Sequence, residues 1–243
     1  MAATELYSTY LLNDPSIKGY YRFSSNVNDS SSNGKNLTVV GSANYTTGVF
    51  GNAYTQNNSF SNYLARASDN MGIDGGAITL GCWFKDINTP GTSSSYAGII
   101  DQKSITSWTQ YGIGLVKDSG NNFIYFSRGR VGVAASNIQA NWSSYVSTSV
   151  FKFYVLTYDG TTLRAYVDSE LVGSISTSGN GSSVSGNTNH FRIGASEGWD
   201  GASYISNGIV DDAFIFSRAL TPAEIRYLYS GVYPSGVFFH NFL

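Results

Sequence analysis

The stretch that decides the fold is GIVDDAFIFSRALTPAEIRYLYSG, residues 208–231. Its first half alternates apolar residues with the period of a β-strand. Its second half carries the start signals of a helix, with Thr221 as N-cap and Glu224 three residues after it. Apolar residues then recur at helical spacing, so we predict a strand followed by a short helix that packs on a sheet.

Outside this stretch, short apolar alternations recur between clusters of Gly, Asn, Ser and Asp. Many short strands with no helix between them are typical of an antiparallel sandwich and not of βαβ units. Asp159-Gly160 predicts a tight hairpin turn, and Asp168-Ser169 predicts a second one. The segments expected to form strands are 19–23, 35–41, 78–86, 97–103, 111–118, 122–128, 151–159, 162–169, 170–176, 190–196 and 208–218.

The chain divides into one large unit and two short ends. We predict an N-terminal segment at 1–15 that can form a short helix, a sandwich at 16–231, and an aromatic tail at 232–243. Within the sandwich, Cys82 shares a strand face with Leu80 and Phe84, which predicts a small buried side chain.

Composition excludes several classes of protein. Only 12% of the residues are charged, the net charge is −2 and the pI is about 5.6, so no basic surface for nucleic acid or anionic membranes is expected. A single cysteine allows neither an internal disulfide nor a Cys-rich zinc site. No apolar run has transmembrane length and no signal peptide is visible, so we expect the protein at an extracellular surface or on a virion by another route.

Six segments in order carry a resemblance to a known family. They are GYYRFSSNVNDSSSNG at 19–34, GVFGNAY at 48–54, ITLGCWFK at 78–85, YVLTYDGTTLRAYVDSEL at 154–171, FRIGA at 191–195 and GIVDDAFIFSRALTPAEIRYLY at 208–229. Together they resemble the laminin-G-like, concanavalin A-like jelly rolls of bacterial surface proteins and phage structural proteins. The resemblance implies an all-β fold, a two-sheet antiparallel jelly-roll sandwich with a short C-terminal helix. It also implies a binding site, often on the concave sheet, and in many relatives a calcium ion near the rim.

Asp211 and Asp212 are adjacent carboxylates inside a strand. Alternation puts Asp211 on a face with Ile215 and Asp212 on the other face with Phe214, so the two cannot form an acid/base pair across a sugar. One interpretation is a structural calcium site, to which Asp29 and Asn33 would add oxygen ligands. The other is a set of hydrogen bonds to Arg or backbone N–H groups with no metal.

Tryptophans in polar loops suggest where a ligand binds. Trp108 and Trp199 are flanked by Ser, Gln, Glu and Asp, and an exposed ring beside short polar groups suits a sugar. With Tyr111 and Asp200 they form the predicted ligand-binding set. The alternative is that each tryptophan caps the core or anchors a subunit interface.

Catalysis is not expected. The chain lacks the Glu-x-Asp-x-x-Glu strand of the related glucanases, and its two histidines have no flanking nucleophile motif. We therefore predict a non-catalytic adhesion module with lectin-like binding of a glycan or surface partner. The alternative is a structural virion or decoration protein of a phage, attached to capsid, tail or fibre through protein contacts. The aromatic tail at 232–243 fits that alternative, and it also fits a homo-oligomer.

Overall fold

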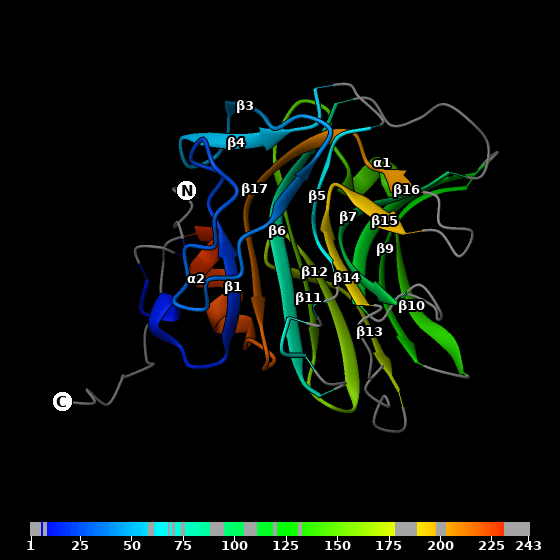
Figure 1. Cartoon of the computed structure of the whole chain (residues 1–243). Helices are drawn as coiled ribbons and strands as arrows, with labels where there is room; N and C mark the ends of the chain where they lie inside the picture. The colour runs from blue at the N-terminus through cyan, green and yellow to red at the C-terminus, as the bar shows by residue number, and fades with distance from the viewer. Residues whose placement is uncertain are drawn as a thin grey trace.

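The fold is a sandwich of two β-sheets, seen in a computed structural model of the whole chain (Figure 1). The structure describes residues 6, 9–57, 61–67, 69, 71–73, 76–87, 95–104, 111–118, 121–130, 133–177, 189–197 and 203–230. The sheets are antiparallel apart from one parallel pairing, between Ile205 and Gly98. The predicted all-β jelly-roll sandwich with a short C-terminal helix is confirmed.

The first sheet has eight strands in the order β13-β12-β11-β6-β17-β4-β3, with β1 beside β17. Their bounds are β1 Ile17–Tyr21, β3 Asn44–Thr47, β4 Asn52–Thr55, β6 Ile78–Asp86, β11 Lys152–Tyr158, β12 Thr162–Val167, β13 Glu170–Ser176 and β17 Gly208–Phe216. We call it the eight-stranded sheet.

The second sheet has nine strands in the order β10-β9-β8-β7-β14-β5-β2, with the β15–β16 hairpin beside β7. Their bounds are β2 Thr38–Val40, β5 Tyr63–Arg66, β7 Ser95–Ser104, β8 Tyr111–Asp118, β9 Asn121–Arg130, β10 Val133–Asn141, β14 Asn189–Ile193, β15 Ala195–Glu197 and β16 Ser203–Ile205. The helices are the 3-10 turn η2 at Tyr10–Asn13, α1 at Trp142–Tyr145 and α2 at Pro222–Ser230. In the part of the chain that the structure describes, no helix is long and apolar enough to cross a membrane.

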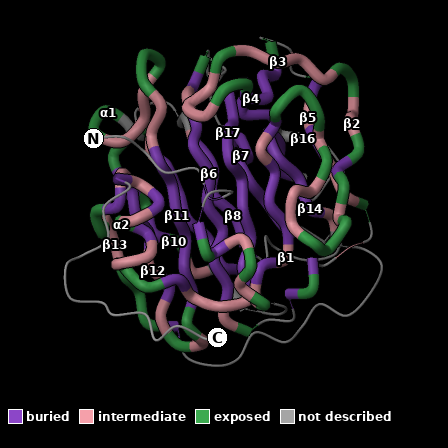
Figure 2. The backbone as a smooth tube through the Cα atoms, turned by 90° about the vertical axis from the view of Figure 1, so that its left-hand side faces the viewer, coloured by how far each residue is buried: buried purple, intermediate pink, exposed green. Residues whose placement is uncertain are grey.

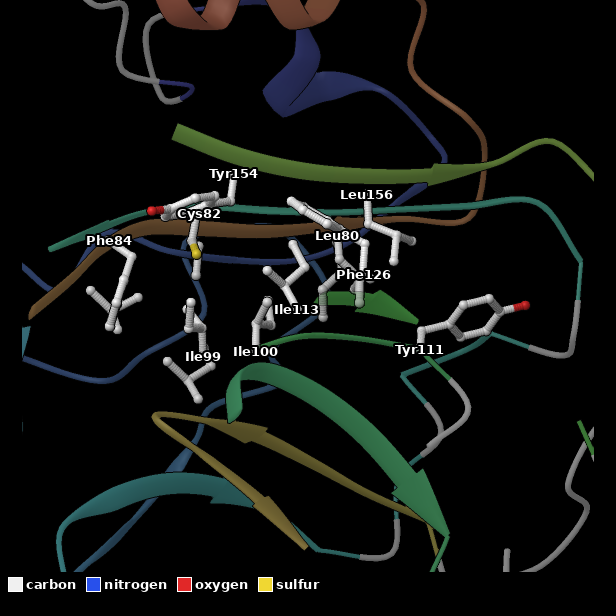
Figure 3. Close-up of a cluster of buried hydrophobic side chains, with 14 of the residues drawn as sticks. Leu80, Cys82, Phe84, Ile99, Ile100, Tyr111, Ile113, Phe126, Tyr154 and Leu156 are labelled. Atoms are coloured by element: carbon white, nitrogen blue, oxygen red, sulfur yellow. The ribbon is translucent and has the colours of Figure 1, made fainter. Parts of the chain in front are cut away.

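The main core lies between the two sheets. Figure 2 shows that the central strands of both sheets are buried along most of their length, whereas the turns are exposed. On β6, Leu80, Cys82 and Phe84 enter this core, as Figure 3 shows, and the predicted burial of Cys82 is confirmed. Burial raises the pKa of the Cys82 thiol, and the Asp211 carboxylate adds to the rise, so this thiol stays protonated at neutral pH.

A second apolar cluster covers the outer face of the eight-stranded sheet. Trp83, Phe153 and Phe214 point outward from the sheet and are buried under η2 and α2. The Tyr229 ring of α2 stacks on Trp83 with 5.7 Å between centroids. Both terminal segments therefore cover one face of one sheet, which Figure 1 shows on its left side.

Helix α2 begins with the predicted capping box. Thr221 N–H donates to Glu224 Oε2 at 2.7 Å, and Glu224 N–H donates back to Thr221 Oγ1 at 3.2 Å. Arg218 joins this end of the helix to the N-terminal segment, with 2.6 Å from its Nη2 both to Asp14 Oδ2 and to Glu224 Oε1. Residues 231–243, which include the predicted tail, lie outside the described residues.

Several predicted elements match the structure. The strands predicted at 78–86, 111–118 and 170–176 have the observed bounds of β6, β8 and β13. The two predicted hairpin turns are confirmed by positive φ values of 102° at Gly160, 51° at Asp168 and 70° at Ser169. Sequence patterning missed β3, β4, β5, β10 and β16.

Candidate functional site

Strand β17 changes its neighbour in the middle. Its first residues pair with β4, where Ile209 lies opposite Thr55, and its last residues pair with β1, where Ala213 lies opposite Tyr21. On the other side it pairs with β6 throughout, with a register shift between Asp211 and Phe214. This bulge coincides with the change from β4 to β1, so Asp211 and Asp212 lie where one backbone ladder ends and the next begins.

The Asp211 side chain accepts backbone hydrogen bonds at the gap between β4 and β1, where β17 has no neighbouring strand on that side among the described residues. It is fully buried. Its Oδ2 accepts hydrogen bonds from Val49 N–H at 2.8 Å and Phe50 N–H at 2.9 Å, and its Oδ1 accepts one from Asp212 N–H at 3.0 Å. The carboxylate thus binds the tip of the β3–β4 hairpin to the centre of the sheet.

Asp212 has a matching role toward the N-terminal segment. Its φ is +47°, its side chain is 2% exposed, and its Oδ1 accepts the Tyr20 hydroxyl proton at 2.6 Å. Its Oδ2 accepts Leu6 N–H at 3.3 Å.

The predicted opposite faces of the two aspartates are wrong. Register pairs Asp211 with Trp83, which belongs to the outer cluster, and Tyr20, the partner of Asp212, belongs to that cluster too. The bulge adds one residue to β17, which shifts the alternation between Val210 and Ala213.

Asp29 and Asn33 hold the loop that follows β1. Asp29 Oδ1 accepts Tyr20 N–H at 3.0 Å and Ser31 N–H at 2.9 Å, and its Oδ2 accepts Lys35 N–H at 2.9 Å. Asn33 Nδ2 donates to Ile17 O at 3.0 Å. Asn33 also lines a pocket of about 430 Å³ beside η2.

These four residues do not fit a shared calcium site. Asp29 binds the backbone N–H of Tyr20 and Asp212 binds its phenol, so the two carboxylates lie at opposite ends of one tyrosine. The Asp211 carboxylate points away from both, toward the backbone N–H groups of Val49 and Phe50. The partial positive charge on these N–H groups would repel a calcium ion. Among the described residues, no group of three or more His, Cys, Asp or Glu side chains could hold a metal ion.

We therefore expect stability to be independent of calcium. The melting temperature of the full chain should be the same within about 1 °C in excess chelator and in about 5 mM calcium, because hydrogen-bond donors of the protein already satisfy the carboxylates. Differential scanning calorimetry of the same preparation in both buffers checks this. A calcium-dependent rise of several degrees that is lost in Asp29→Asn would restore the calcium interpretation.

Of the predicted ligand-binding residues, only Tyr111 lies within the described residues. Trp108, Trp199 and Asp200 lie outside them. Tyr111 is 1% exposed, belongs to the core between the sheets, and donates its hydroxyl proton to Gly76 O at 3.1 Å. Burial raises the pKa of Tyr111, and this ring offers no surface to a ligand outside the sandwich.

A polar pocket of about 540 Å³ lies at the β3 edge of the eight-stranded sheet. Direct strand pairing puts Lys85, Ile209, Thr55 and Asn44 in one row across β6, β17, β4 and β3. This row is on the outer face, because the adjacent Val210 faces the main core. The lining is Asn44, Tyr45, Thr46, Thr55, Asn57, Lys85, Asp86, Ile87, Thr148 and Ile209.

The pocket offers short hydrogen-bonding groups. Two amides, three threonine hydroxyls, one ammonium group and one carboxylate share its lining with the partly exposed Tyr45. Tyr45 pairs with Tyr54 and packs against the main core, so its ring lies on the other face of the sheet from the row of Lys85 and Thr55. Lys85 Nζ lies 5.0 Å from the Phe151 ring centroid. This cation–π contact holds the ammonium group at the β6 end of the row. Burial raises the pKa of Tyr45, so its phenol keeps its proton at neutral pH and can donate a hydrogen bond.

Sequence patterning did not find this pocket. Asn44, Tyr45 and Thr46 belong to β3, and Thr55 belongs to β4, both strands of four residues that the alternation did not reveal. The available signal was the aromatic residue inside the polar run NYTT, which is too short to separate from a loop.

Comparison with known proteins gives the family and the fold. A laminin G family model, described as the concanavalin A-like lectin/glucanases superfamily, matches residues 56–226. No curated protein sequence matches the chain.

Three solved structures illustrate the likeness. The binding domain of Paraclostridial Mosquitocidal Protein 1 has a TM-score of 0.68 and 13% identity, over 90% of this chain and 53% of that chain. A botulinum neurotoxin type C structure has a TM-score of 0.68 and 15% identity, over 90% of this chain and 52% of that chain. Domain 4 of an extracellular arabinanase from Geobacillus stearothermophilus has a TM-score of 0.61 and 18% identity, over 88% of this chain and 98% of that chain. The protein thus spans about half the length of the two toxin chains and nearly all of the arabinanase domain.

Proposed function

The chain belongs to the concanavalin A-like lectin/glucanases superfamily, and from this premise we propose that it is a non-catalytic binding module that takes a glycan in the pocket at the β3 edge. The pocket is the observation that carries the proposal. A sugar presents hydroxyl groups around a ring with an apolar C–H face. The amide and hydroxyl groups of the lining complement the hydroxyl groups of a sugar.

Solved relatives support binding as the type of function. The arabinanase domain was solved in complex with arabinotriose, and the neurotoxin type C structure concerns interaction with two ganglioside molecules. Another botulinum neurotoxin binding domain was solved in complex with rat synaptotagmin II, a protein partner. We favour a glycan here because most of the pocket lining consists of amide, hydroxyl and charged groups. The relatives also favour an extracellular location.

The phage alternative has less support. It depends on the sequence resemblance and on the aromatic tail at 232–243, which lies outside the described residues. None of the solved relatives described above is a virion protein. A catalytic function also has less support, because the relatives are named as a binding domain or as a separate domain of an enzyme.

A glycan array followed by calorimetry tests the pocket. Wild-type protein should bind at least one glycan, and Asn44→Ala should weaken that binding about tenfold or more, because a sugar hydroxyl loses its amide partner. Thr55→Ala, at the centre of the row, should weaken it by a smaller factor. Tyr10→Ala is the matched control, since Tyr10 is 40% exposed and does not line the pocket.

Trp199→Ala separates the two possible locations. If Asn44→Ala leaves binding intact and Trp199→Ala abolishes it, the glycan binds at the segment between β15 and β16 as first predicted, and the pocket proposal is wrong. If no glycan on the array binds, glycan recognition itself is contradicted.

A further inference from the structure

The core contains a charged side chain with no counter-ion among the described residues. Arg128 is 1% exposed and follows Ile124 and Phe126 on the core-facing side of β9. Its Nε, Nη1 and Nη2 make no hydrogen bond of normal geometry in the part of the chain that the structure describes, although the guanidinium group lies near enough to the Tyr111 hydroxyl to act against the rise in the pKa of that phenol. A buried guanidinium group carries five N–H donors and a positive charge, so this arrangement is costly unless something binds it.

A second unsatisfied side chain lies close by in the same row. Strand register pairs Gln102 of β7 with Tyr111 of β8, and Tyr111 with Arg128 of β9, so all three point to the core from adjacent strands. Gln102 is fully buried, and neither its Oε1 nor its Nε2 has a partner within the described residues. An amide donor and a guanidinium fork thus flank one tyrosine.

The opposite sheet completes the surroundings of Arg128. Its Cζ lies 4.0 Å from the ring centroid of Tyr158 on β11, so the guanidinium group stacks on an aromatic face. Stacking leaves the edge of the guanidinium plane available, and this edge carries the N–H donors.

The group lies near the end of the sandwich. Figure 3 shows Tyr111 at one end of the core cluster with its hydroxyl pointing away from the aliphatic side chains. That hydroxyl donates to Gly76 O at 3.1 Å, and the Tyr158 hydroxyl donates to Gly160 O at 2.5 Å. Gly76 is exposed, and a Cβ built at either glycine would meet no atom within 4 Å.

We propose that Arg128, together with the Gln102 amide, forms a binding site for one small oxyanion, either a carboxylate or an inorganic oxyanion. A planar guanidinium fork matches two oxygens of such an anion, and bidentate pairing of this kind is stronger than a neutral hydrogen bond. The amide adds a donor on the far side of Tyr111. The site is at the opposite end of β6 from the glycan pocket, because Ile78 at the start of β6 pairs with Tyr158 whereas Lys85 at its end lines the pocket.

Thermal unfolding of the full chain tests this site. Wild type and Arg128→Met are melted in formate, acetate, sulfate and phosphate, each against chloride at the same ionic strength. Methionine keeps an unbranched apolar stem and removes the guanidinium group, and general salt effects act on both proteins alike. At saturating oxyanion, the melting temperature of wild type should rise by about 3 °C or more beyond the rise in Arg128→Met.

The set of effective anions identifies the source. A response to formate and acetate alone indicates a carboxylate site, and a response to sulfate or phosphate indicates an inorganic oxyanion. Equal responses of wild type and Arg128→Met to all four anions would overturn the proposal.

Two further measurements guard against a variant that fails to fold. Isothermal titration of wild type with the effective anion should show one saturable site, and heat without saturation contradicts the proposal. Arg128→Lys keeps the charge but loses the fork, and Gln102→Leu loses the amide donor, so each should weaken the anion about tenfold or more. An unchanged affinity in both variants would place the anion elsewhere.

Discussion

Replacing Asp211 with alanine is expected to lower the free energy of unfolding by about 3–5 kcal/mol. The carboxylate is fully buried and accepts N–H groups from Val49, Phe50 and Asp212. Alanine leaves these three donors without an acceptor at the point where β17 changes its neighbour. Urea unfolding at pH 7, followed by tryptophan fluorescence, measures the loss.

Two variants interpret that result. Asp211→Asn keeps the shape but presents an amide NH₂ to N–H donors, so we expect an intermediate loss of about 2–3 kcal/mol. Glu170→Ala removes an exposed carboxylate from the edge strand β13 and should change stability by about 0.5 kcal/mol or less. If Asp211→Ala costs no more than Glu170→Ala, the carboxylate does not hold the β3–β4 hairpin to the sheet.

Replacing Gly98 with alanine is expected to cost about 3 kcal/mol. Gly98 lies on β7 beneath the β15–β16 hairpin, opposite Ile205. A Cβ there would overlap the backbone of Ala195 and Ser196, which cannot move aside as the end of a flexible side chain can. The hairpin would have to lift from β7 and lose the hydrogen bond from Ser196 Oγ to Asp101 Oδ2. Urea unfolding measures the stability, and limited proteolysis shows whether cleavage increases at the hairpin.

Gly76→Ala is the matched control for this substitution. A Cβ at Gly76 would meet nothing within 4 Å, so the stability should change by about 0.5 kcal/mol or less. Equal effects of the two substitutions would mean that the hairpin does not pack on β7 as closely as described.

The fold could be predicted to the extent that single strands carry their own pattern. On β6 the alternation is unbroken, so it correctly places Leu80 and Cys82 on one face of the strand and Trp83 on the other. Leu80 and Cys82 lie in the main core, and Trp83 lies in the outer cluster. On β17 the same reasoning failed, because a bulge is set by pairing with β6 and leaves no mark in the local sequence. The faces of Asp211 and Asp212 were therefore unpredictable from alternation alone.

The two proposed sites differ in how visible they were. The glycan pocket draws its lining from five separate segments, among them β3 and β4, and only tertiary pairing brings Asn44 beside Thr55. The sequence does indicate where Arg128 points, because it follows Ile124 and Phe126 at every second residue of β9 and so lies on the same face of the strand. Its burial was nevertheless not expected, because a charged residue at the end of a strand is usually solvated.

The central place of β17 also determines when the protein can fold during its synthesis. Tyr20 on β1 and Asp212 on β17 are hydrogen-bonded although they are 192 residues apart in the chain. A nascent chain that has left the ribosome only as far as residue 207 lacks the strand that joins β6 to β1 and β4. Closure of the eight-stranded sheet must wait until β17 has been synthesised. Contacts of this sequence separation are expected to give folding in milliseconds to seconds once β17 has left the ribosome. Until then the unpaired edge of β6 can pair with another chain, so it has to be shielded from such pairing.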